Sequence, residues 1–77
     1  MKLLIRDIVV GTRIKHKYDT RPMTIAAVDQ RSAYRFYIDV LYRDGSVEGW
    51  GIRPDNRHEF TKLPPPPNLP EGEVEYD

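Results

Sequence analysis

Apolar and polar residues alternate along much of residues 12–63, a spacing that is typical of β-strands with one buried face. The alternation is clearest over 35–43, where alternate side chains would face a core. That core-facing set is Phe36, Ile38, Val40 and Tyr42. The whole pattern predicts five short strands, at 12–18, 23–29, 35–43, 46–52 and 58–63. Since no segment has convincing helical periodicity, we expect an all-β fold.

Turn residues separate these predicted strands. Gly11 comes before the first strand, and residues 30–33 form a polar turn. Residues 19–22 are expected to form a loop, because Pro22 lacks a backbone N–H and restricts the residue before it. Residues 53–56 are expected to end the fourth strand in a 3₁₀ turn, and Asp44-Gly45 is a hairpin signal.

Two of these turns carry a resemblance. The Gly11-Thr12-Arg13-Ile14 opening and the Tyr42-Arg43-Asp44-Gly45-Ser46 hairpin resemble those of small SH3-like β-barrels of the KOW and Tudor type. The resemblance covers residues 8–63 and implies a five-stranded SH3-like barrel that acts as a recognition module. A KOW module usually places a glycine early in its second strand, where this chain has Met23-Thr24-Ile25.

The hairpin leaves two registers open, and they place Trp50 differently. A two-residue Asp44-Gly45 turn would put Trp50 on the outer face beside Tyr37 and Leu41. A three-residue loop with a glycine bulge would instead pack Trp50 against Ile38 in the core. On the first alternative the outer tryptophan could bind a base, a peptide or a cation; on the second it fills space.

Charge divides the chain into two parts. Residues 1–63 hold all twelve Lys and Arg and eight of the twelve acids, a net charge of +4, whereas residues 64–77 hold four acids and no base. We therefore expect a barrel at 1–63 and a disordered, proline-rich acidic tail at 64–77. In the tail, the residues that could dock on a partner are Glu71, Glu73, Glu75 and Tyr76. The alternative is a solubilising tail.

The basic residues of the body suggest a second binding surface. Alternation puts Arg13, Lys15 and Lys17 on one side of the first strand, with Arg21 in the following loop, as a groove for phosphates would require. Further candidates that could extend this stripe or an aromatic face are Arg31, Arg35, Tyr37, Trp50, Arg53 and Arg57. The alternative is an ordinary solvated face. A Tudor-type cage built from Tyr34, Tyr37, Tyr42 and Trp50 is a further alternative, although these rings alternate between faces.

Catalytic chemistry is poorly supplied. The chain has no cysteine and two histidines, with no His/Cys spacing typical of a metal site, so we expect neither enzymatic activity nor a metal or cofactor. Gly45-Ser46-Val47 resembles the plasmid-borne trimethoprim-resistant dihydrofolate reductases. There Gln-Ile-Tyr follows; here Glu48-Gly49-Trp50 follows, so that activity is not implied.

The function we predict is therefore recognition. The barrel's aromatic face or its tail is expected to dock on a larger protein machine, with a nucleic-acid enzyme as one candidate. The alternative is direct, salt-sensitive nucleic-acid binding through the basic stripe. The N-terminal apolar run is broken by Arg6 and Asp7, so we expect no membrane span, a cytoplasmic location, and a monomer or weak homodimer. A small body with an accessory tail fits a phage origin.

Overall fold

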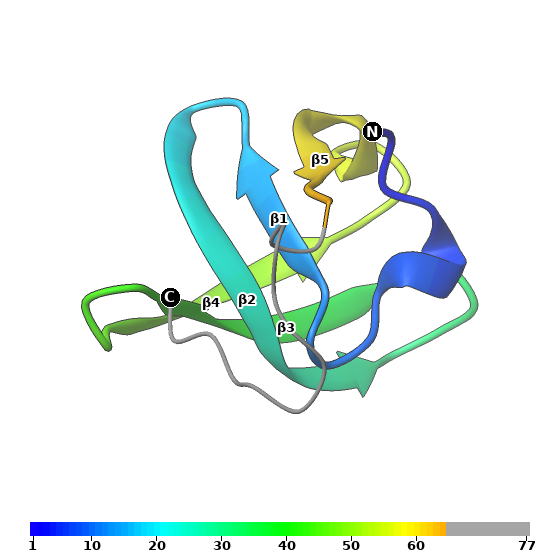
Figure 1. Cartoon of the computed structure of the whole chain (residues 1–77). Coiled ribbons are helices and arrows are strands. Elements are labelled where there is room, and N and C mark those ends of the chain that lie inside the picture. The colour runs from blue at the N-terminus through cyan, green and yellow to red at the C-terminus, as the bar shows by residue number, and fades with distance from the viewer. Residues whose placement is uncertain (65–77) are drawn as a thin grey trace, which may run out of the picture.

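The computed structural model describes residues 1–64, and five antiparallel strands make up half of them (Figure 1). The strands are β1 (Arg13–His16), β2 (Asp19–Gln30), β3 (Phe36–Tyr42), β4 (Val47–Ile52) and β5 (Phe60–Lys62). Two short 3₁₀ helices are present, η1 (Ile5–Asp7) and η2 (Arg57–Glu59). The all-β prediction is confirmed. The expectations for Glu71, Glu73, Glu75 and Tyr76 lie outside the described residues.

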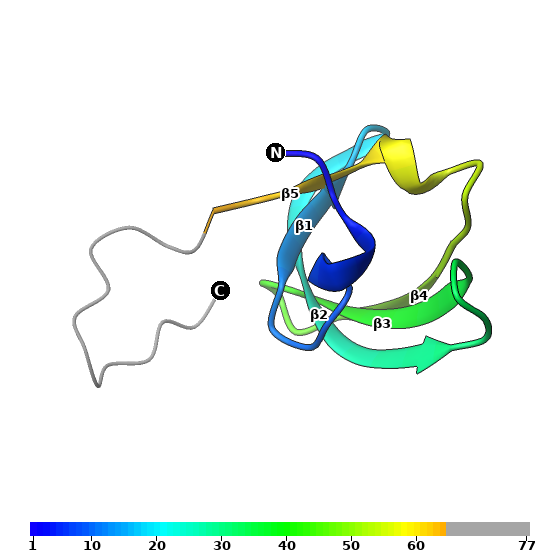
Figure 2. The same cartoon turned by 90° about the vertical axis from the view of Figure 1, so that its right-hand side faces the viewer.

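The five strands form one curved sheet in the order β4-β3-β2-β1-β5. Figure 2 shows the sheet bending round, so that β5 and η2 lie opposite β3 and β4 across a common interior. The N-terminus covers the outer edge of β5, because Lys2 bridges to Thr61 and the backbone N–H of Lys62 donates to the carbonyl of Met1 over 2.7 Å. The body is therefore barrel-like and closed at one edge by its own first residues.

The core is built from the inward-facing positions of the strands and from the N-terminal segment. Its buried apolar members are Leu3, Ile8, Ile14, Met23, Ile25, Phe36, Ile38, Val40, Tyr42, Ile52 and Phe60. Along β3 the alternation is complete, with Phe36, Ile38, Val40 and Tyr42 buried and the residues between them exposed. The period-2 pattern of the sequence thus identified the core face of this strand correctly.

The β3–β4 hairpin adopts the three-residue loop with a glycine bulge. Ile38 pairs with Trp50, and the backbone N–H groups of Tyr42 and Gly45 donate to the carbonyls of Ser46 and Tyr42, respectively. Gly45 has a φ of 90°, a conformation that side chains disfavour and that this bulge requires. This register puts Trp50 on the inner face, partly buried against the core.

The prediction of a loop at residues 19–22 is wrong, because β2 already begins at Asp19. The β1–β2 register shifts between Ile14 and His16, which leaves the stretch containing Pro22 in an irregular part of the ladder. Proline is tolerated there because no regular ladder hydrogen bond is needed from its nitrogen. The fifth strand is also shorter than predicted, since residues 57–59 form η2 and the turn at 53–56 precedes that helix.

Candidate functional site: an outer face with arginines

The outer face of β3 and β4 exposes large apolar side chains. Tyr37 is 58% exposed, Leu41 40% and Val47 60%, and Leu41 pairs directly with Val47 across the two strands. Gly49 and Gly51 lie on the same face of β4, with the Asp39 side chain beside Gly49 and the Tyr37 ring beside Gly51. This combination forms a shallow surface over the hairpin, which we call the hairpin face (Tyr37, Leu41, Val47, Gly49 and Gly51).

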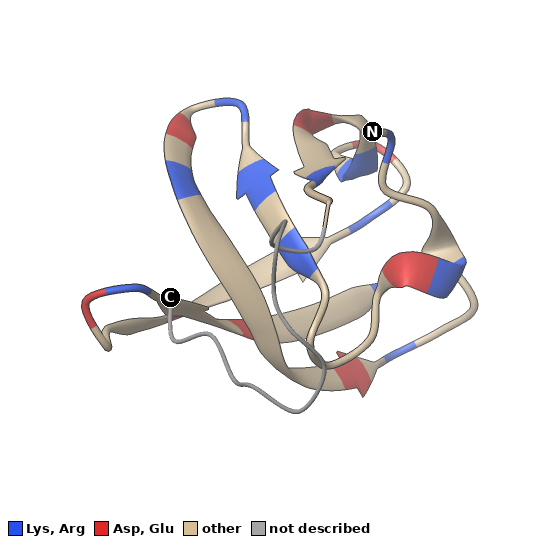
Figure 3. Cartoon of the chain, viewed as in Figure 1, with Lys and Arg blue, Asp and Glu red and all other residues tan. Residues whose placement is uncertain are grey.

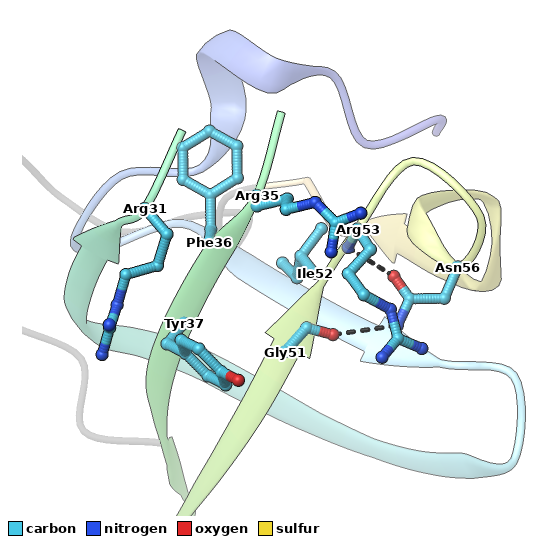
Figure 4. Close-up of a pocket in the computed structure, with 8 residues that line it drawn as sticks. All are labelled: Arg31, Arg35, Phe36, Tyr37, Gly51, Ile52, Arg53 and Asn56. Carbon is cyan, nitrogen blue, oxygen red and sulfur yellow. Dashed lines mark hydrogen bonds between the residues drawn. The ribbon is translucent and has the colours of Figure 1, made fainter. Parts of the chain in front are cut away.

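A pocket of about 450 Å³ opens at one end of the hairpin face, where β3 begins and β4 ends (Figure 4). We call it the arginine pocket, because Arg31, Arg35 and Arg53 line it together with Tyr37. The remaining lining residues are Phe36, Gly51, Ile52 and Asn56. In Figure 4, Arg31 lies on one side of Tyr37, and Arg35 and Arg53 lie on the other.

Two hydrogen-bonded turns position these arginines. In the β2–β3 turn, the backbone N–H groups of Arg31 and Ser32 donate to the carbonyl of Arg35 over 2.8 and 3.3 Å. After β4, the Asn56 side chain accepts from the Arg53 N–H over 2.7 Å and donates to the Gly51 carbonyl over 2.9 Å. Because both segments are held locally, the arginines start from backbone positions that do not depend on a ligand.

The guanidinium groups of the pocket are only partly engaged. Nε of Arg31 lies 2.9 Å from Oδ2 of Asp29, and Nε of Arg53 lies 3.1 Å from Oδ1 of Asp55. Within residues 1–64 the terminal nitrogens of both side chains make no hydrogen bond, and the guanidinium of Arg35 makes neither a hydrogen bond nor an ion pair. The guanidinium of Arg31 also lies 5.1 Å from the Tyr37 ring centroid, within cation–π range.

The stripe predicted on the first strand is brought together only in part. Arg13 and Lys15 are both half-buried on β1, and basic positions follow β1 in Figure 3. Arg13 lines a small hollow together with Leu41 and Arg43. Lys17 is exposed, 3.9 Å from a Glu59 carboxylate oxygen, so its charge is partly balanced.

Arg21 belongs to a separate cluster at the start of β2. It makes a two-pronged ion pair with Asp19, at 3.0 and 2.8 Å, and its guanidinium lies 4.0 Å from the Tyr42 ring centroid. The hydrogen bond from Arg21 holds the pKa of Asp19 well below its usual range. The Tyr42 hydroxyl donates its single proton to Glu48 over 3.0 Å and also lies 3.3 Å from Oδ2 of Asp19. Arg21 is thus engaged in covering a core tyrosine.

The aromatic residues do not form a cage. Trp50 packs with His16 and Phe60, at centroid distances of 4.7 and 5.6 Å, on the inner side of the sheet. Tyr42 is buried, whereas Tyr37 is exposed on the opposite face of β3. Trp50 therefore contributes nothing to the hairpin face that Tyr37 occupies. Among residues 1–64, no group of three His, Asp or Glu side chains could hold a metal ion.

Arg35, Tyr37 and Arg53 were predicted as binding residues, and the structure brings all three to one pocket. Arg57 lies elsewhere, in a smaller hollow with Ile5, Tyr34 and Pro54. Arg31, named as a further candidate for the stripe, lines the same pocket, whereas Asn56 was not predicted as a site residue. A signal for Asn56 was present, since asparagine in a turn often bonds to nearby backbone, and here its side chain bonds to Arg53, three residues earlier.

In comparisons with known proteins, this chain matches no family model, no curated protein and no solved structure. None of the helices formed by the described residues is long and apolar enough to cross a membrane.

Proposed function

We propose that this chain is a non-enzymatic recognition module, a small SH3-like barrel that docks on a larger protein through its hairpin face. The observation that supports this proposal is the exposure of Tyr37, Leu41 and Val47 together on one side of the sheet. Apolar side chains gathered on an exposed surface are typical of sites that a partner covers. Tyrosine and arginine are also the residues in which protein interfaces are enriched.

Charge favours a partner with an acidic surface. Arginines flank the hairpin face at both ends: Arg43 beside the hollow near Leu41, and the arginine pocket at the opposite end of the strands. Complementary charges would speed the encounter and set its orientation, while the exposed apolar side chains would supply contact area. We extend the proposal to a cytoplasmic module that acts as a monomer or weak homodimer and has a nucleic-acid enzyme among its candidate partners.

The test is affinity capture with the immobilised full-length chain, using extract from the cells that encode it. We expect a double variant, Leu41→Glu with Val47→Glu, to lose the specifically captured protein, because it places two carboxylates on the docking surface. Val10→Glu is the matched control, since Val10 is 65% exposed but lies in the loop before β1. Capture that is equal for the wild type and the double variant would show that this face does not dock.

Nucleic-acid binding through the first strand is the second candidate, supported by Arg13 and Lys15 on β1 and by Arg43, which shares a hollow with Arg13. It predicts salt-sensitive affinity for duplex DNA. The variant Arg13→Ala/Lys15→Ala/Lys17→Ala should lower that affinity and flatten its salt dependence. Unchanged affinity in this variant would exclude the stripe.

A further inference from the structure

The arginine pocket gathers more positive charge than its neighbours balance. Arg31, Arg35 and Arg53 line one hollow, and the carboxylates of Asp29 and Asp55 each reach only one guanidinium, at its Nε. Like charges held together without full compensation raise the local potential and favour an anion between them. The pocket is thus prepared for a negatively charged ligand.

The free terminal nitrogens match a tetrahedral oxyanion. A guanidinium presents paired N–H donors in a planar fork, and this geometry suits phosphate oxygens. Arg35 immediately precedes β3, Arg53 immediately follows β4, and both lie on the same side of Tyr37 (Figure 4). A phosphate between them would receive charged hydrogen bonds from two directions.

Tyr37 adds a planar surface at the same place. Its Cε1 lies 3.5 Å from the position that a Cβ on Gly51 would occupy, so the ring rests beside bare backbone of β4. More than half of the side chain remains exposed, and Arg31 borders it. Exposed tyrosine rings on sheets, with arginines beside them, stack on nucleobases with little preference for sequence.

We propose that the arginine pocket binds a nucleotide, with its phosphate at Arg35 and Arg53 and its base against Tyr37. A volume of about 450 Å³ lies within the range of pockets that hold small ligands. A carboxylate-bearing peptide would satisfy the arginines but would leave the tyrosine ring unused. The nucleotide could be free or part of a single strand, since both carry the same phosphate and base.

The experiment is a nuclear magnetic resonance titration of the full-length chain. Its probes are adenosine monophosphate, inorganic phosphate, adenosine, a short thymidine oligonucleotide and an acidic peptide. We expect the nucleotide to shift the arginine side-chain signals and the amides of Tyr37 and Gly51 at lower concentration than phosphate or adenosine alone. If the oligonucleotide binds much more tightly than adenosine monophosphate, the ligand is a nucleic-acid strand. If the two affinities are equal, the ligand is a free nucleotide.

Matched variants separate this site from general charge effects. Arg35→Ala and Tyr37→Leu should each weaken nucleotide binding at least about five-fold, the lower range for losing one stacked base. Arg6→Ala and Tyr18→Leu make the same chemical changes at exposed positions outside the pocket and should leave the affinity unchanged.

Several results would overturn the proposal. The first is that neither nucleotide probe shifts the pocket signals. The second is that phosphate alone binds as tightly as the nucleotide. The third is that Arg35→Ala and Arg6→Ala lose the same amount of affinity. Binding of the acidic peptide without binding of nucleotide would assign the pocket to a protein segment instead.

Discussion

Nε2 of His16 lies 2.8 Å from Oε1 of Glu59, while Nδ1 of the same ring accepts a hydrogen bond from the Tyr18 backbone N–H. Because Nδ1 acts as an acceptor, the arrangement assigns the proton to Nε2, and the imidazole donates to the carboxylate. The ring is only 6% exposed and packs 4.7 Å from Trp50 and 4.9 Å from Phe60. This pair therefore joins β1 to η2 at the point where the sheet curves over the core.

We expect Glu59→Ala to destabilise the fold by about 1–3 kcal/mol, because it leaves a buried donor on His16 without its acceptor. Urea unfolding followed by Trp50 fluorescence would measure the change. His58→Ala is the control, since His58 is exposed and should shift the free energy of unfolding by no more than about 0.5 kcal/mol. Equal effects of the two variants would show that the pair contributes nothing.

Asp7 is expected to make the fold sensitive to acid. Its carboxylate accepts the Leu4 backbone N–H over 2.9 Å and lies 3.0 Å from Nζ of Lys62, and these contacts lower its pKa below the ordinary value of 3.8. A pKa that is lower in the folded chain stabilises the fold above the unfolded value, and this contribution is lost as the pH falls below about 4.

Asp7→Asn should therefore be less stable than the wild type at neutral pH. The difference in stability between the two proteins should become smaller as the pH is lowered. Thermal unfolding at a series of pH values would measure it. Asp55→Asn changes an exposed carboxylate in the same way and should show no such convergence. A stability difference between the wild type and Asp7→Asn that stays constant at every acidic pH would contradict the role of Asp7.

Tyr42 gives the opposite dependence on pH. Burial, and then its hydrogen bond to Glu48, raise the pKa of Tyr42 above the ordinary value of 10.0. Since the folded pKa is the higher one, the neutral phenol stabilises the fold at lower pH, and stability is lost as the pH rises from about 10. Ultraviolet absorbance should show one tyrosine that ionises later than the exposed ones, and Tyr42→Phe should remove that late component. An unchanged titration curve would exclude the assignment.

The β3–β4 loop depends on one glycine. Gly45 has a φ of 90° and nothing within 4 Å of the position of a Cβ, so Gly45→Ala would suffer from backbone conformation alone. We expect a loss of about 1 kcal/mol in the free energy of unfolding, measured in urea. At Gly49 a Cβ would make an ordinary contact, 3.8 Å from Asp39, so Gly49→Ala should be neutral or slightly stabilising. A larger loss of stability in Gly49→Ala than in Gly45→Ala would contradict the glycine bulge.

The strands and the core face of β3 could be predicted because alternation is a local property of the sequence. The position of Trp50 could not, since a loop one residue longer moves every side chain of β4 to the other face and the Asp44-Gly45 pair permits both loops. The loop predicted at residues 19–22 from Pro22 was wrong for a related reason. Whether a strand tolerates proline depends on which backbone N–H groups bond to the next strand, and that depends on the register of β1 and β2.

The candidate site was predictable in its residue types but not in its grouping. Arg35, Tyr37 and Arg53 stood out as exposed candidates, but their convergence depends on β3 starting where β4 ends, which is a long-range pairing. Arg21 is the opposite case. It was predicted to join the basic stripe, but it lies over Tyr42 and forms an ion pair with Asp19. A count of charges in the sequence does not show which basic side chains are already paired with acidic ones.

The pairing of Met1 and Lys2 with β5 limits how copies of this barrel could join. A sheet with two free edges can add neighbours on both sides and grow into a fibre. Here the first residues pair with the free side of β5, so the outermost strand at that end of the sheet is already covered. At the other end, β4 pairs with β3 alone. Two barrels that met through β4 would each present the covered β5 edge to the next molecule, which would oppose further growth by strand addition.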